Sequence, residues 1–413
     1  MHPSPTHPAP GASPPGRLPA PAPDDLARSA ALARHIAGQI EAAGGWWSFA
    51  RFMEACLYTP GLGYYSGPAG KLGTGPADGS DFVTAPEISS LFGRALARQV
   101  AQVLRGLPAG TSEIIELGAG TGKLACDLLA ELGRMNDPAC LPQRYAILDL
   151  SGDLRARQQE RLRTTVPQWA DRVVWLEHLP ERIDGVVLAN EVADAMPVHL
   201  MAWRQGSWHE RGVVAAAGRE TPFAFEDRLA AAPLTEAMRA RLGAQPHLPD
   251  GYLTELNLAA PALITSLAER LGTGLLLFID YGFPAAEFFH PQRTQGTLMA
   301  HYRHQVHGDV LRWPGLQDLT AHVDFTALAQ AGCDAGLDVL GYLNQASLLL
   351  NCGIATLLEG TPEQPALWLP QVNALQRLTS EAEMGELFKA IALGKGIAMN
   401  LVGFARGDRL HAL

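Results

Sequence analysis

The stretch IIELGAGTGKL at residues 114–124 limits, more than any other feature, what this chain can fold into. A short apolar run is followed directly by glycines at positions 118, 120 and 122. Because glycine has no Cβ, the backbone there can turn sharply and let a ligand approach closely. A strand that ends in such a turn and leads into a helix is typical of α/β proteins that bind a ligand at a sheet edge. A tight turn with a helix cap and no ligand is the simpler alternative.

The rest of the chain alternates strands and helices in the same way. Short apolar or β-branched runs predict further strands at residues 145–148, 173–176, 186–189, 275–279 and 396–404. Amphipathic spacing predicts helices at residues 89–107, 123–132 and 154–163. Strands that alternate with helices favour a parallel sheet covered on both faces. The sequence therefore predicts an α/β fold.

Composition and pattern divide the chain into regions. These are a disordered tail rich in proline and alanine at 1–25, a helical and loop region that contributes to the active site at 26–110, and the sheet domain at 111–406. Two insertions in that domain, 191–273 and 281–345, are predicted to cover the substrate. The first contains a hairpin that turns at Gln205-Gly206-Ser207.

Composition also excludes several classes of protein. The net charge is −10 over 413 residues without a dense Lys/Arg run, so a nucleic-acid partner is not expected. Five cysteines without a C-x-x-C pair indicate neither a disulfide framework nor a zinc site, and they suit a reducing compartment. The longest apolar runs, such as residues 274–279, are far too short to cross a bilayer. The predicted location is the cytoplasm of a bacterium.

Three ligands compete for the glycine turn. ATP requires four residues between the glycines and Ser or Thr after the lysine, but Gly118 and Gly122 enclose three and Leu124 follows. A dinucleotide requires G-x-G-x-x-G, and the glycines here are one residue short of that spacing. The remaining pattern, E-x-G-x-G-x-G, resembles the first motif of class I S-adenosylmethionine-dependent methyltransferases.

S-adenosylmethionine suits the residues near this turn. It carries a sulfonium and an ammonium but no phosphate, so its pocket needs close backbone approach and nearby acids. Glu116 and Asp149 end two predicted strands, and Asp149 can accept hydrogen bonds from both ribose hydroxyls. Asp149 lies 31 residues beyond Gly118, where the usual interval is about 20. The loop at 135–143 explains this longer connection.

Seven stretches of the chain resemble the MidA-like methyltransferase family. They are FMEACLYTPGLGYYS (52–66), DFVTAPEISSLFGRALA (81–97), IIELGAGTGKLACDLL (114–129), LANEVADAMPVHL (188–200), FIDYGFPAAEF (278–288), GTLMAHYRH (296–304) and DLTAHVDFTAL (318–328). The resemblance implies a Rossmann-like class I methyltransferase core: a mostly parallel seven-stranded sheet with helices on both faces, plus helical and loop insertions. Eukaryotic members are mitochondrial assembly factors for respiratory complex I, and the family's known activity is symmetric dimethylation of an arginine on a complex I subunit.

Residue types and resemblance together indicate where the cofactor and the acceptor would bind. The predicted cofactor-binding residues are Glu116, Gly118, Gly120, Thr121, Gly122, Asp149 and Asn190. Those predicted to line the acceptor are Thr84, Pro86, Glu87, Asp280 and Tyr281. Glu191 and Asp194 are the predicted catalytic pair, because paired carboxylates can orient a guanidinium and localise its charge. The alternative is that Asn190 caps a short helix, Glu191 complements the helix dipole and Asp194 faces solvent.

Other chemistries fit these residues less well. Enzymes that methylate amino groups of DNA bases usually have Asn/Asp-Pro-Pro-aromatic after this strand, where this chain has Asn-Glu-Val-Ala. His301, His304 and His307 recur at every third residue, but they lie in a loop-like stretch and methyl transfer from a sulfonium needs no metal. No metal is predicted. Asp324 is explained equally well as the N-cap of a helix that ends near Gly336.

Two functions are compatible with these features. The first is an S-adenosyl-L-methionine-dependent methyltransferase that acts on an arginine side chain of a protein, such as a respiratory complex I subunit. The second is an assembly chaperone that binds the cofactor without turnover. The acids Glu116, Asp149, Glu191 and Asp194 favour the enzyme. The sequence leaves the acceptor and the oligomeric state open, a homodimer included.

Overall fold

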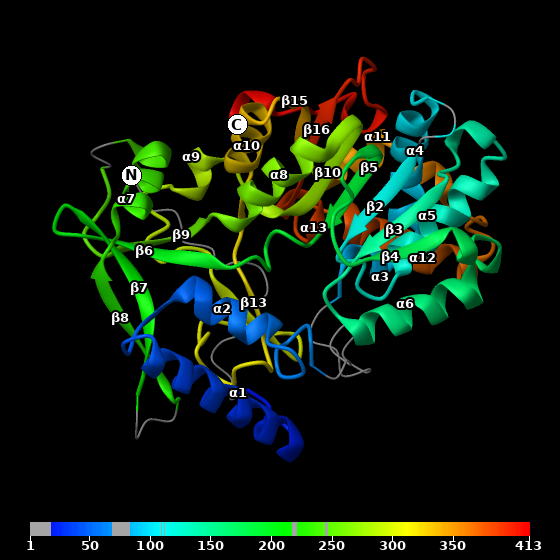
Figure 1. Ribbon diagram of the computed structural model, residues 1–413. Coiled ribbons are helices and arrows are strands. Elements are labelled where there is room, and N and C mark those ends of the chain that lie inside the picture. Colours follow the sequence, from blue (N-terminus) through cyan, green and yellow to red (C-terminus); the bar gives the residue numbers. More distant parts are fainter. Residues whose placement is uncertain (1–17, 68–82, 109, 111, 217–220, 244–246) are drawn as a thin grey trace.

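The largest sheet of the molecule contains eight strands (Figure 1). The computed structural model describes residues 18–67, 83–108, 110, 112–216, 221–243 and 247–413. Seven strands follow the order β15 (Asp338–Asn344), β16 (Phe388–Lys395), β10 (Leu271–Phe283), β5 (Ile183–Asn190), β2 (Glu113–Leu117), β3 (Arg144–Leu148) and β4 (Val173–Leu176), and β14 (Val323–Asp324) pairs with β10. All pairs are parallel except those of β16, which is antiparallel to both neighbours. The predicted mostly parallel seven-stranded sheet is confirmed, with one short strand added.

Alternating side chains bury this sheet on both faces. In β2, Ile114 packs toward one layer of helices and Ile115 toward the other. The first layer contains α4 (Ser90–Arg105), α5 (Lys123–Arg134), α6 (Gly152–Thr165), α11 (Gln345–Asn351) and α12 (Pro365–Thr379), and the second contains α8 (Ala259–Arg270) and α10 (Phe325–Asp334). Within the described residues, no helix combines the length and apolar character that crossing a membrane would require.

The last strand of the sheet lies before the predicted one. Residues 396–404 were predicted as a strand, but β16 ends at Lys395 and Gly396 turns the chain with φ 67°. The N–H groups of Val402 and Gly403 donate at 2.8 Å to the Gln102 and Gln99 side chains of α4. The backbone of this apolar segment therefore finds its hydrogen-bond partners on a helix, and the prediction was wrong.

A second sheet, of five strands, begins soon after β5 ends. Its order is β1 (Trp47–Ser48), β7 (Ser207–Ala215), β6 (Val198–Arg204) and β9 (Tyr252–Asn257), with β8 (Phe223–Leu229) paired to β7. One face packs on α1 (Pro23–Ala42) and α2 (Phe49–Tyr58), and the other on α7 (Ala232–Leu242) and α9 (Ala285–Phe288). Between β6 and β7 the chain turns at Gln205 and Gly206, with φ 49° and 76°, which confirms the predicted hairpin.

The predicted N-terminal region and the two predicted insertions each contribute one helix to the central core. Helix α4 lies in the region 26–110, α8 in the insertion 191–273, and α10 in the insertion 281–345, yet all three pack on the central sheet. The second insertion also holds a small sheet of β11 (Met299–Tyr302), β12 (Gln305–His307) and β13 (Asp318–Thr320). Most of the predicted tail 1–25 lies outside the described residues, and α1 begins at Pro23.

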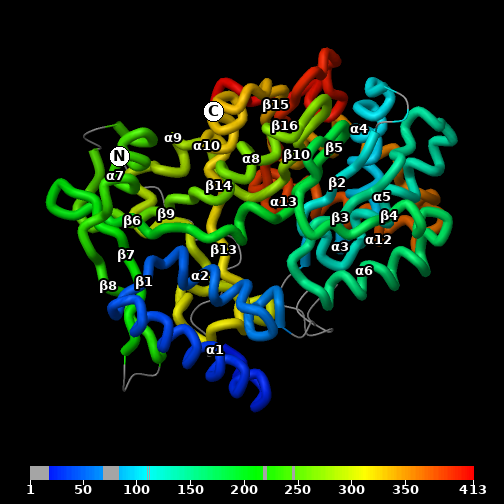
Figure 2. Tube along the Cα trace, in the orientation of Figure 1, coloured from blue at the N-terminus to red at the C-terminus, as the bar shows by residue number. Residues whose placement is uncertain are grey.

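The order of the strands creates a site at the carboxyl edge of the central sheet. Strand β2 lies between β3 and β5. After β2 the chain forms β3 and β4 on one side of it, and it then crosses to form β5 on the other side. Ligands of open α/β sheets bind at such a reversal. In the trace of Figure 2, the chain runs from β5 past this edge directly into β6 of the second sheet.

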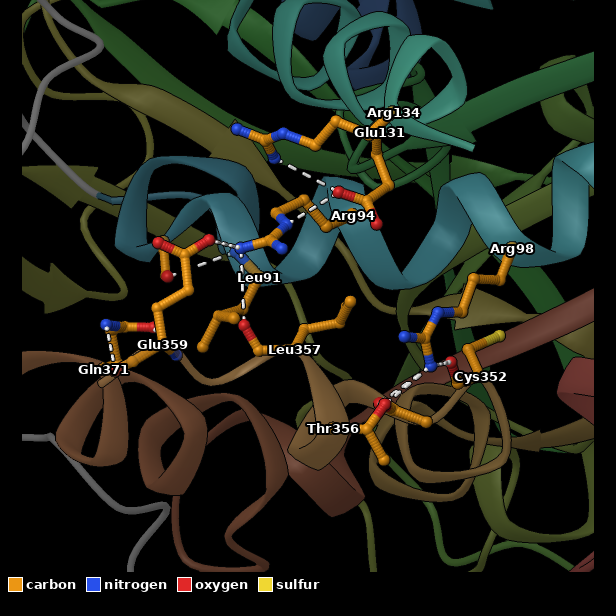
Figure 3. Close-up of polar contacts among 12 residues, drawn as sticks. Leu91, Arg94, Arg98, Glu131, Arg134, Cys352, Thr356, Leu357, Glu359 and Gln371 are labelled. Carbon is orange, nitrogen blue, oxygen red and sulfur yellow. Dashed lines mark hydrogen bonds and ion pairs between the residues drawn. The ribbon is translucent and has the colours of Figure 1, made fainter. Parts of the chain in front are cut away.

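Polar contacts tie the C-terminal part of the chain to α4 (Figure 3). The Arg94 guanidinium donates to Glu131 of α5 at 2.8 Å and to Glu359 at 2.7 Å. One helical turn later, Arg98 donates to the Cys352 carbonyl at 3.0 Å and the Thr356 hydroxyl at 2.9 Å. These contacts hold α4, which leads toward the glycine turn, between α5 and the chain that follows α11.

Candidate active site

The glycine turn joins β2 to α5. Gly118, Gly120 and Gly122 have φ of 59°, 53° and 80°, in the left-handed region that other residues rarely adopt. The Gly118 N–H donates at 2.9 Å to the carbonyl of Leu148, at the end of β3. A Cβ on Gly122 would lie 3.3 Å from Gln158 of α6, so α6 packs closely on the turn. The glycine spacing seen in the sequence thus has a conformational cause.

Asp149 follows β3 and is fixed to the glycine turn. Its carboxylate accepts hydrogen bonds from the Ser151 N–H at 3.0 Å and from Gln158 Nε2 at 2.8 Å. Gln158 Nε2 also donates to the Gly120 carbonyl at 2.9 Å. Burial raises the pKa of Asp149, and these hydrogen bonds oppose that shift. Leu150, the next residue, is 77 % exposed and places an apolar surface beside the acid. A fixed acid next to an apolar surface suits a nucleoside, whose sugar is polar and whose base is flat.

Gln158 is a site residue that the sequence interpretation missed. Besides binding Asp149 and the glycine turn, its Oε1 accepts a hydrogen bond from Trp175 Nε1 at 2.8 Å. Its side chain is fully buried. The signal was a polar residue midway between Leu154 and Leu162 on the buried stripe of α6, where an apolar residue would be ordinary.

Glu116, a predicted cofactor-binding residue, is buried in the core. Its carboxyl is 3 % exposed and accepts a hydrogen bond at 2.7 Å from the Tyr145 hydroxyl, within the layer between the sheet and α5. Burial raises the pKa of Glu116 to about 7. The structure therefore places this acid beneath the glycine turn, apart from the carboxylates that follow β5.

Those carboxylates lie in residues 190–195, which we call the acidic turn. Asp280, at the end of β10, holds it in place. One carboxylate oxygen of Asp280 accepts hydrogen bonds from the N–H groups of Val192, Ala193 and Asp194 at 3.2, 2.9 and 3.2 Å. The other accepts from the Tyr281 N–H at 2.9 Å. These four contacts show that Asp280, which is predicted to line the acceptor, also organises the backbone of the acidic turn.

Glu191 is held in an unusual conformation within the acidic turn. Its φ is 54°, and its N–H donates at 2.9 Å to the Ile279 carbonyl. Its Oε1 accepts hydrogen bonds from Asn190 Nδ2 and from the Ala85 N–H, both at 3.1 Å. Burial, and then the nearby Asp194 carboxylate, raise the pKa of Glu191 to about 8. Residues 191–197 form turns, so the alternative in which Asn190 caps a short helix is wrong.

Asp194 lies in the same cluster and is only 6 % exposed, not on the solvated face that the alternative required. Burial raises the pKa of Asp194 to about 6, and the Tyr281 hydroxyl beside it opposes that shift. Among the residues that the structure describes, Asp194 Oδ1 and Asn190 Oδ1 are buried acceptors without a hydrogen-bond partner. Buried acceptors normally have donors. A ligand that carries several N–H groups would supply them.

The segment before α4 reaches both parts of the site. It contains Thr84, whose backbone starts the short helix α3 (Ala85–Ile88), and Pro86, which is buried. Glu87 accepts hydrogen bonds from the Thr121 hydroxyl of the glycine turn and, at 3.4 Å, from Arg161 of α6. Glu87, predicted to line the acceptor, therefore contacts the predicted cofactor loop. Arg161 was not anticipated from the sequence.

Tyr281 and the nearby histidines form a packed group. The Tyr281 ring packs edge-to-face on His322 and Phe388, with centroids 5.1 and 5.4 Å away. Burial lowers the pKa of His322 to about 3 and that of His301 to about 4. His301 Nε2 lies 3.1 Å from the Thr320 hydroxyl. Asp324 accepts a hydrogen bond from the Ala327 N–H at 3.1 Å, which confirms it as the N-cap of α10.

Comparison with known proteins identifies the family. Residues 95–343, more than half of the 413-residue chain, match the model of a family described as S-adenosyl-L-methionine-dependent methyltransferases. The chain belongs to this family. Among its relatives is the mitochondrial protein arginine methyltransferase NDUFAF7 of Danio rerio, 29 % identical over 391 residues, which are 87 % of this chain and 85 % of that protein. The protein of the same name from Rattus norvegicus is 29 % identical over 88 % of this chain and 84 % of its own length.

Two solved structures from Burkholderia thailandensis extend the match to nearly the whole chain. One, which is bound to S-adenosyl-homocysteine, is 52 % identical with a TM-score of 0.90, and the alignment covers 96 % of this chain and all of that one. A native crystal structure from the same organism is 51 % identical with a TM-score of 0.87 and the same coverage. The chain is thus an S-adenosyl-L-methionine-dependent methyltransferase with a class I fold, as the sequence predicts.

Proposed function

We propose that this methyltransferase modifies a guanidinium nitrogen of an arginine in a protein substrate. The observation that supports it best is the pair of a buried Asp194 and a partly buried Glu191 beside the glycine turn. Burying two like charges is costly unless a cation joins them. A guanidinium supplies both the positive charge and the N–H donors that the unpartnered Asp194 and Asn190 oxygens lack among the described residues.

The cofactor would be held by residues at the carboxyl ends of β2, β3 and β5. Asp149, fixed by Gln158, suits the ribose hydroxyls, and Leu150 the adenine. The turn through Gly118 and Gly120 allows close approach, while Thr121, Gly122 and Asn190 complete the wall as the sequence predicts. Glu116 would contribute its negative charge from beneath the turn. When bound, S-adenosyl-L-methionine supplies an electrophilic methyl group on a sulfonium.

The chain's own residues then position the acceptor. A guanidinium is a weak nucleophile, because its lone pairs are delocalised, and carboxylates at one end can localise its charge. Asp194 and Glu191 would bind the guanidinium N–H groups, and Thr84, Pro86 and Tyr281 would exclude water around it. As the new N–C bond forms and the bond between the methyl group and sulfur breaks, one N–H proton must leave the nitrogen. A bound guanidinium favours the ionised form of Glu191, and burial raises the pKa of this group, so its carboxylate is a suitable place for that proton.

The class of substrate rests on relatives. The proteins of Danio rerio and Rattus norvegicus are named protein arginine methyltransferases, and the chain covers most of their length. The resemblance noted above directs a first search to respiratory complex I subunits. The alternative function, an assembly chaperone that binds the cofactor without turnover, makes no use of the two carboxylates.

A labelling experiment tests the proposal. A cell lysate is incubated with the enzyme and methyl-labelled S-adenosyl-L-methionine, and labelled residues are located by mass spectrometry. The Glu191→Gln variant should bind the cofactor with unchanged affinity in calorimetry and lose labelling, by about 100-fold or more. Glu236→Gln, at an exposed position of α7, is the matched control.

Two results would speak against the proposal. Cofactor binding without any labelled protein would support the chaperone, and label on lysine or another residue would exclude arginine. Unchanged turnover of Glu191→Gln would remove Glu191 from the mechanism.

A further inference from the structure

Two tyrosines that the proposed function does not use lie next to the acidic turn. Tyr58 ends α2, and Tyr65 follows in the loop after it. Their rings are stacked, with centroids 5.7 Å apart and an interplanar angle of 20°. The Tyr65 N–H donates at 2.9 Å to the Leu57 carbonyl, which fixes the loop against the helix. Both residues are partly exposed, and the Tyr64 ring packs edge-to-face with Tyr65, with centroids 5.1 Å apart. The pair as a whole therefore keeps some surface for another group.

Hydrogen bonds connect the pair to two separate parts of the site. The Tyr58 hydroxyl donates at 3.0 Å to the carbonyl of Ala195, the residue after Asp194. The Tyr65 hydroxyl lies 2.9 Å from both carboxylate oxygens of Asp318, which is 2 % exposed on β13. Helix α2 packs against β13 and β6 in this region (Figure 1). The tyrosines therefore join the N-terminal helices to both insertions at the edge of the site.

The electrostatic surroundings of the pair are acidic. After burial, the Asp318 and Asp194 carboxylates are the main causes that raise the pKa of both hydroxyls. Asp149, the acid that follows β3, also raises the pKa of Tyr58. Tyr58 is thus near both the predicted cofactor acid and the acidic turn. Negative charge around two aromatic rings favours a cation against their faces.

We propose that Tyr58, Tyr65 and Asp318 form the second wall of the acceptor pocket, against which the guanidinium of the substrate arginine stacks. This inference rests on the proposed function, and it explains how the pocket would select arginine. A guanidinium is planar and weakly hydrated, so it can stack on an aromatic ring while its edge binds carboxylates. A lysine ammonium is compact and strongly hydrated, and it would gain less from the same wall.

A packing role predicts different behaviour from a binding role. If the tyrosines only hold α2 against β13, their loss lowers stability and affects every acceptor equally. If they bind the guanidinium, loss of the ring raises the KM for arginine acceptors more than for lysine ones. Loss of a hydroxyl alone, which keeps the ring face, has a smaller effect.

Kinetics on the full-length enzyme separate these cases. The probes are a glycine–arginine repeat peptide and its glycine–lysine counterpart, with methyl transfer followed by mass spectrometry and cofactor affinity by calorimetry. For Tyr65→Leu we expect a KM for the arginine peptide raised by about tenfold, with an unchanged Kd for S-adenosyl-L-methionine. Tyr65→Phe should stay within about threefold of the wild type. Tyr252→Phe, a buried tyrosine of the second sheet, is the control.

The outcomes distinguish the two proposals. A wild-type enzyme that methylates no arginine probe, but modifies another side chain, overturns the proposed function and this inference with it. A wild-type enzyme that methylates arginine, with a KM unaltered in Tyr65→Leu or raised equally for both peptides, overturns this inference alone. If Tyr65→Leu does not fold, Tyr58→Leu and Asp318→Asn provide the same comparison.

Discussion

At the scale of single residues, Asp280 explains how the two proposed catalytic carboxylates come to lie close together. One of its oxygens receives three successive N–H groups of the acidic turn, and the turn also holds Glu191 at φ 54°. Conformations of this kind persist only when their surroundings fix them. The geometry of the site thus depends on a carboxylate that need not touch the substrate.

Replacing Asp280 with asparagine tests this dependence. The amide keeps one acceptor oxygen but faces a backbone N–H with a donor, so we expect a loss of about 2 kcal/mol in the free energy of unfolding. Methyl transfer should fall at least tenfold, because the acidic turn shifts, while cofactor affinity changes little. Denaturant unfolding and steady-state kinetics measure these effects, with the exposed Asp334→Asn as control. Full activity in Asp280→Asn would contradict the positioning role.

The raised pKa of Glu191 predicts how stability varies with pH. Its folded value is about 8 and its ordinary value is 4.5. Between these pH values the folded state holds a proton that the unfolded state has released, so stability falls as pH rises toward 8. From pH 6.5 to 8.5 we expect a decrease of about 1 kcal/mol, a modest value because Glu191 is partly solvated.

Denaturant unfolding at the two pH values measures this decrease. Glu191→Gln cannot ionise, so its free energy of unfolding should change less over the same range. Parallel pH profiles of the variant and the wild type would show that Glu191 has an ordinary pKa.

The glycine turn allows backbone strain to be separated from crowding. Alanine at Gly122 or Gly206 meets the same left-handed backbone, with φ of 80° and 76°, which costs about 1–2 kcal/mol. Only at Gly122 does the added Cβ approach Gln158, at 3.3 Å, whereas nothing lies within 4 Å at Gly206. Gly122→Ala should therefore also displace Gln158 and weaken S-adenosyl-L-methionine binding by about tenfold. Equal cofactor affinity in both variants, measured by calorimetry, would be evidence against close packing of α6 on the turn.

The positions of the acids at the site could be predicted from the sequence more readily than the residues that contact them. Asp149, Glu191 and Asp194 follow strands. The carboxyl edge of a parallel sheet brings the ends of strands together for any conformation of the loops. Tyr58 joins that edge by binding Ala195, 137 residues away, and Asp318 by binding Tyr65, 253 residues away. No local pattern indicates such contacts. For Glu116 and Asp280 the sequence shows an acid, but it does not show that the Tyr145 hydroxyl binds the first and backbone N–H groups bind the second.

At the scale of elements, Arg94 connects three segments that pack around α4 (Figure 3). Its guanidinium binds Glu131 and Glu359, and it donates to the Leu357 carbonyl at 3.3 Å. The Arg94 and Glu131 side chains are only 13 % and 10 % exposed. Removing one partner of such a pair leaves a charge without compensation. This contact should therefore contribute to stability more than a surface ion pair does.

Arg94→Met keeps much of the aliphatic volume and removes the charge. We expect it to lower the free energy of unfolding by about 3 kcal/mol. The comparison is Arg163→Met on α6, whose partner Glu160 is exposed, where the loss should be below about 1 kcal/mol. Urea unfolding measures both variants. Equal effects would show that the Arg94 contacts are no stronger than a surface pair.

The strand predictions agree with the structure in the central sheet and fail where long-range contacts determine the backbone. The predicted strand at 173–176 coincides with β4, and the other four predicted strands of the central core lie within β2, β3, β5 and β10. The final strand was placed at 396–404 because that stretch is apolar. Gln99 and Gln102 of α4 bind its backbone instead, and such a long-range contact leaves no trace in local periodicity.

At the scale of the whole molecule, the site lies where two sheets meet. The acidic turn is the connection between β5 of the central sheet and β6 of the second sheet (Figures 1 and 2). The Glu191 carboxylate also receives the Ala85 N–H, and Tyr58 binds the Ala195 carbonyl. The glycine turn, the N-terminal helices and the second sheet therefore meet at the acidic turn. A ligand bound there should order the parts of each that contact it.

Hydrogen exchange with S-adenosyl-homocysteine tests this convergence. Because a ligand bound only to the folded site suppresses local opening, we expect exchange to slow by about tenfold or more in peptides that cover 84–88, 118–124 and 190–195. The hairpin of β7 and β8 lies outside the site and should exchange as before. Asp149→Asn, which weakens the proposed ribose contact, should remove the protection at all three segments together. Protection limited to residues 118–124 would mean that the cofactor site ends at the glycine turn, and that the acidic turn responds only to the acceptor.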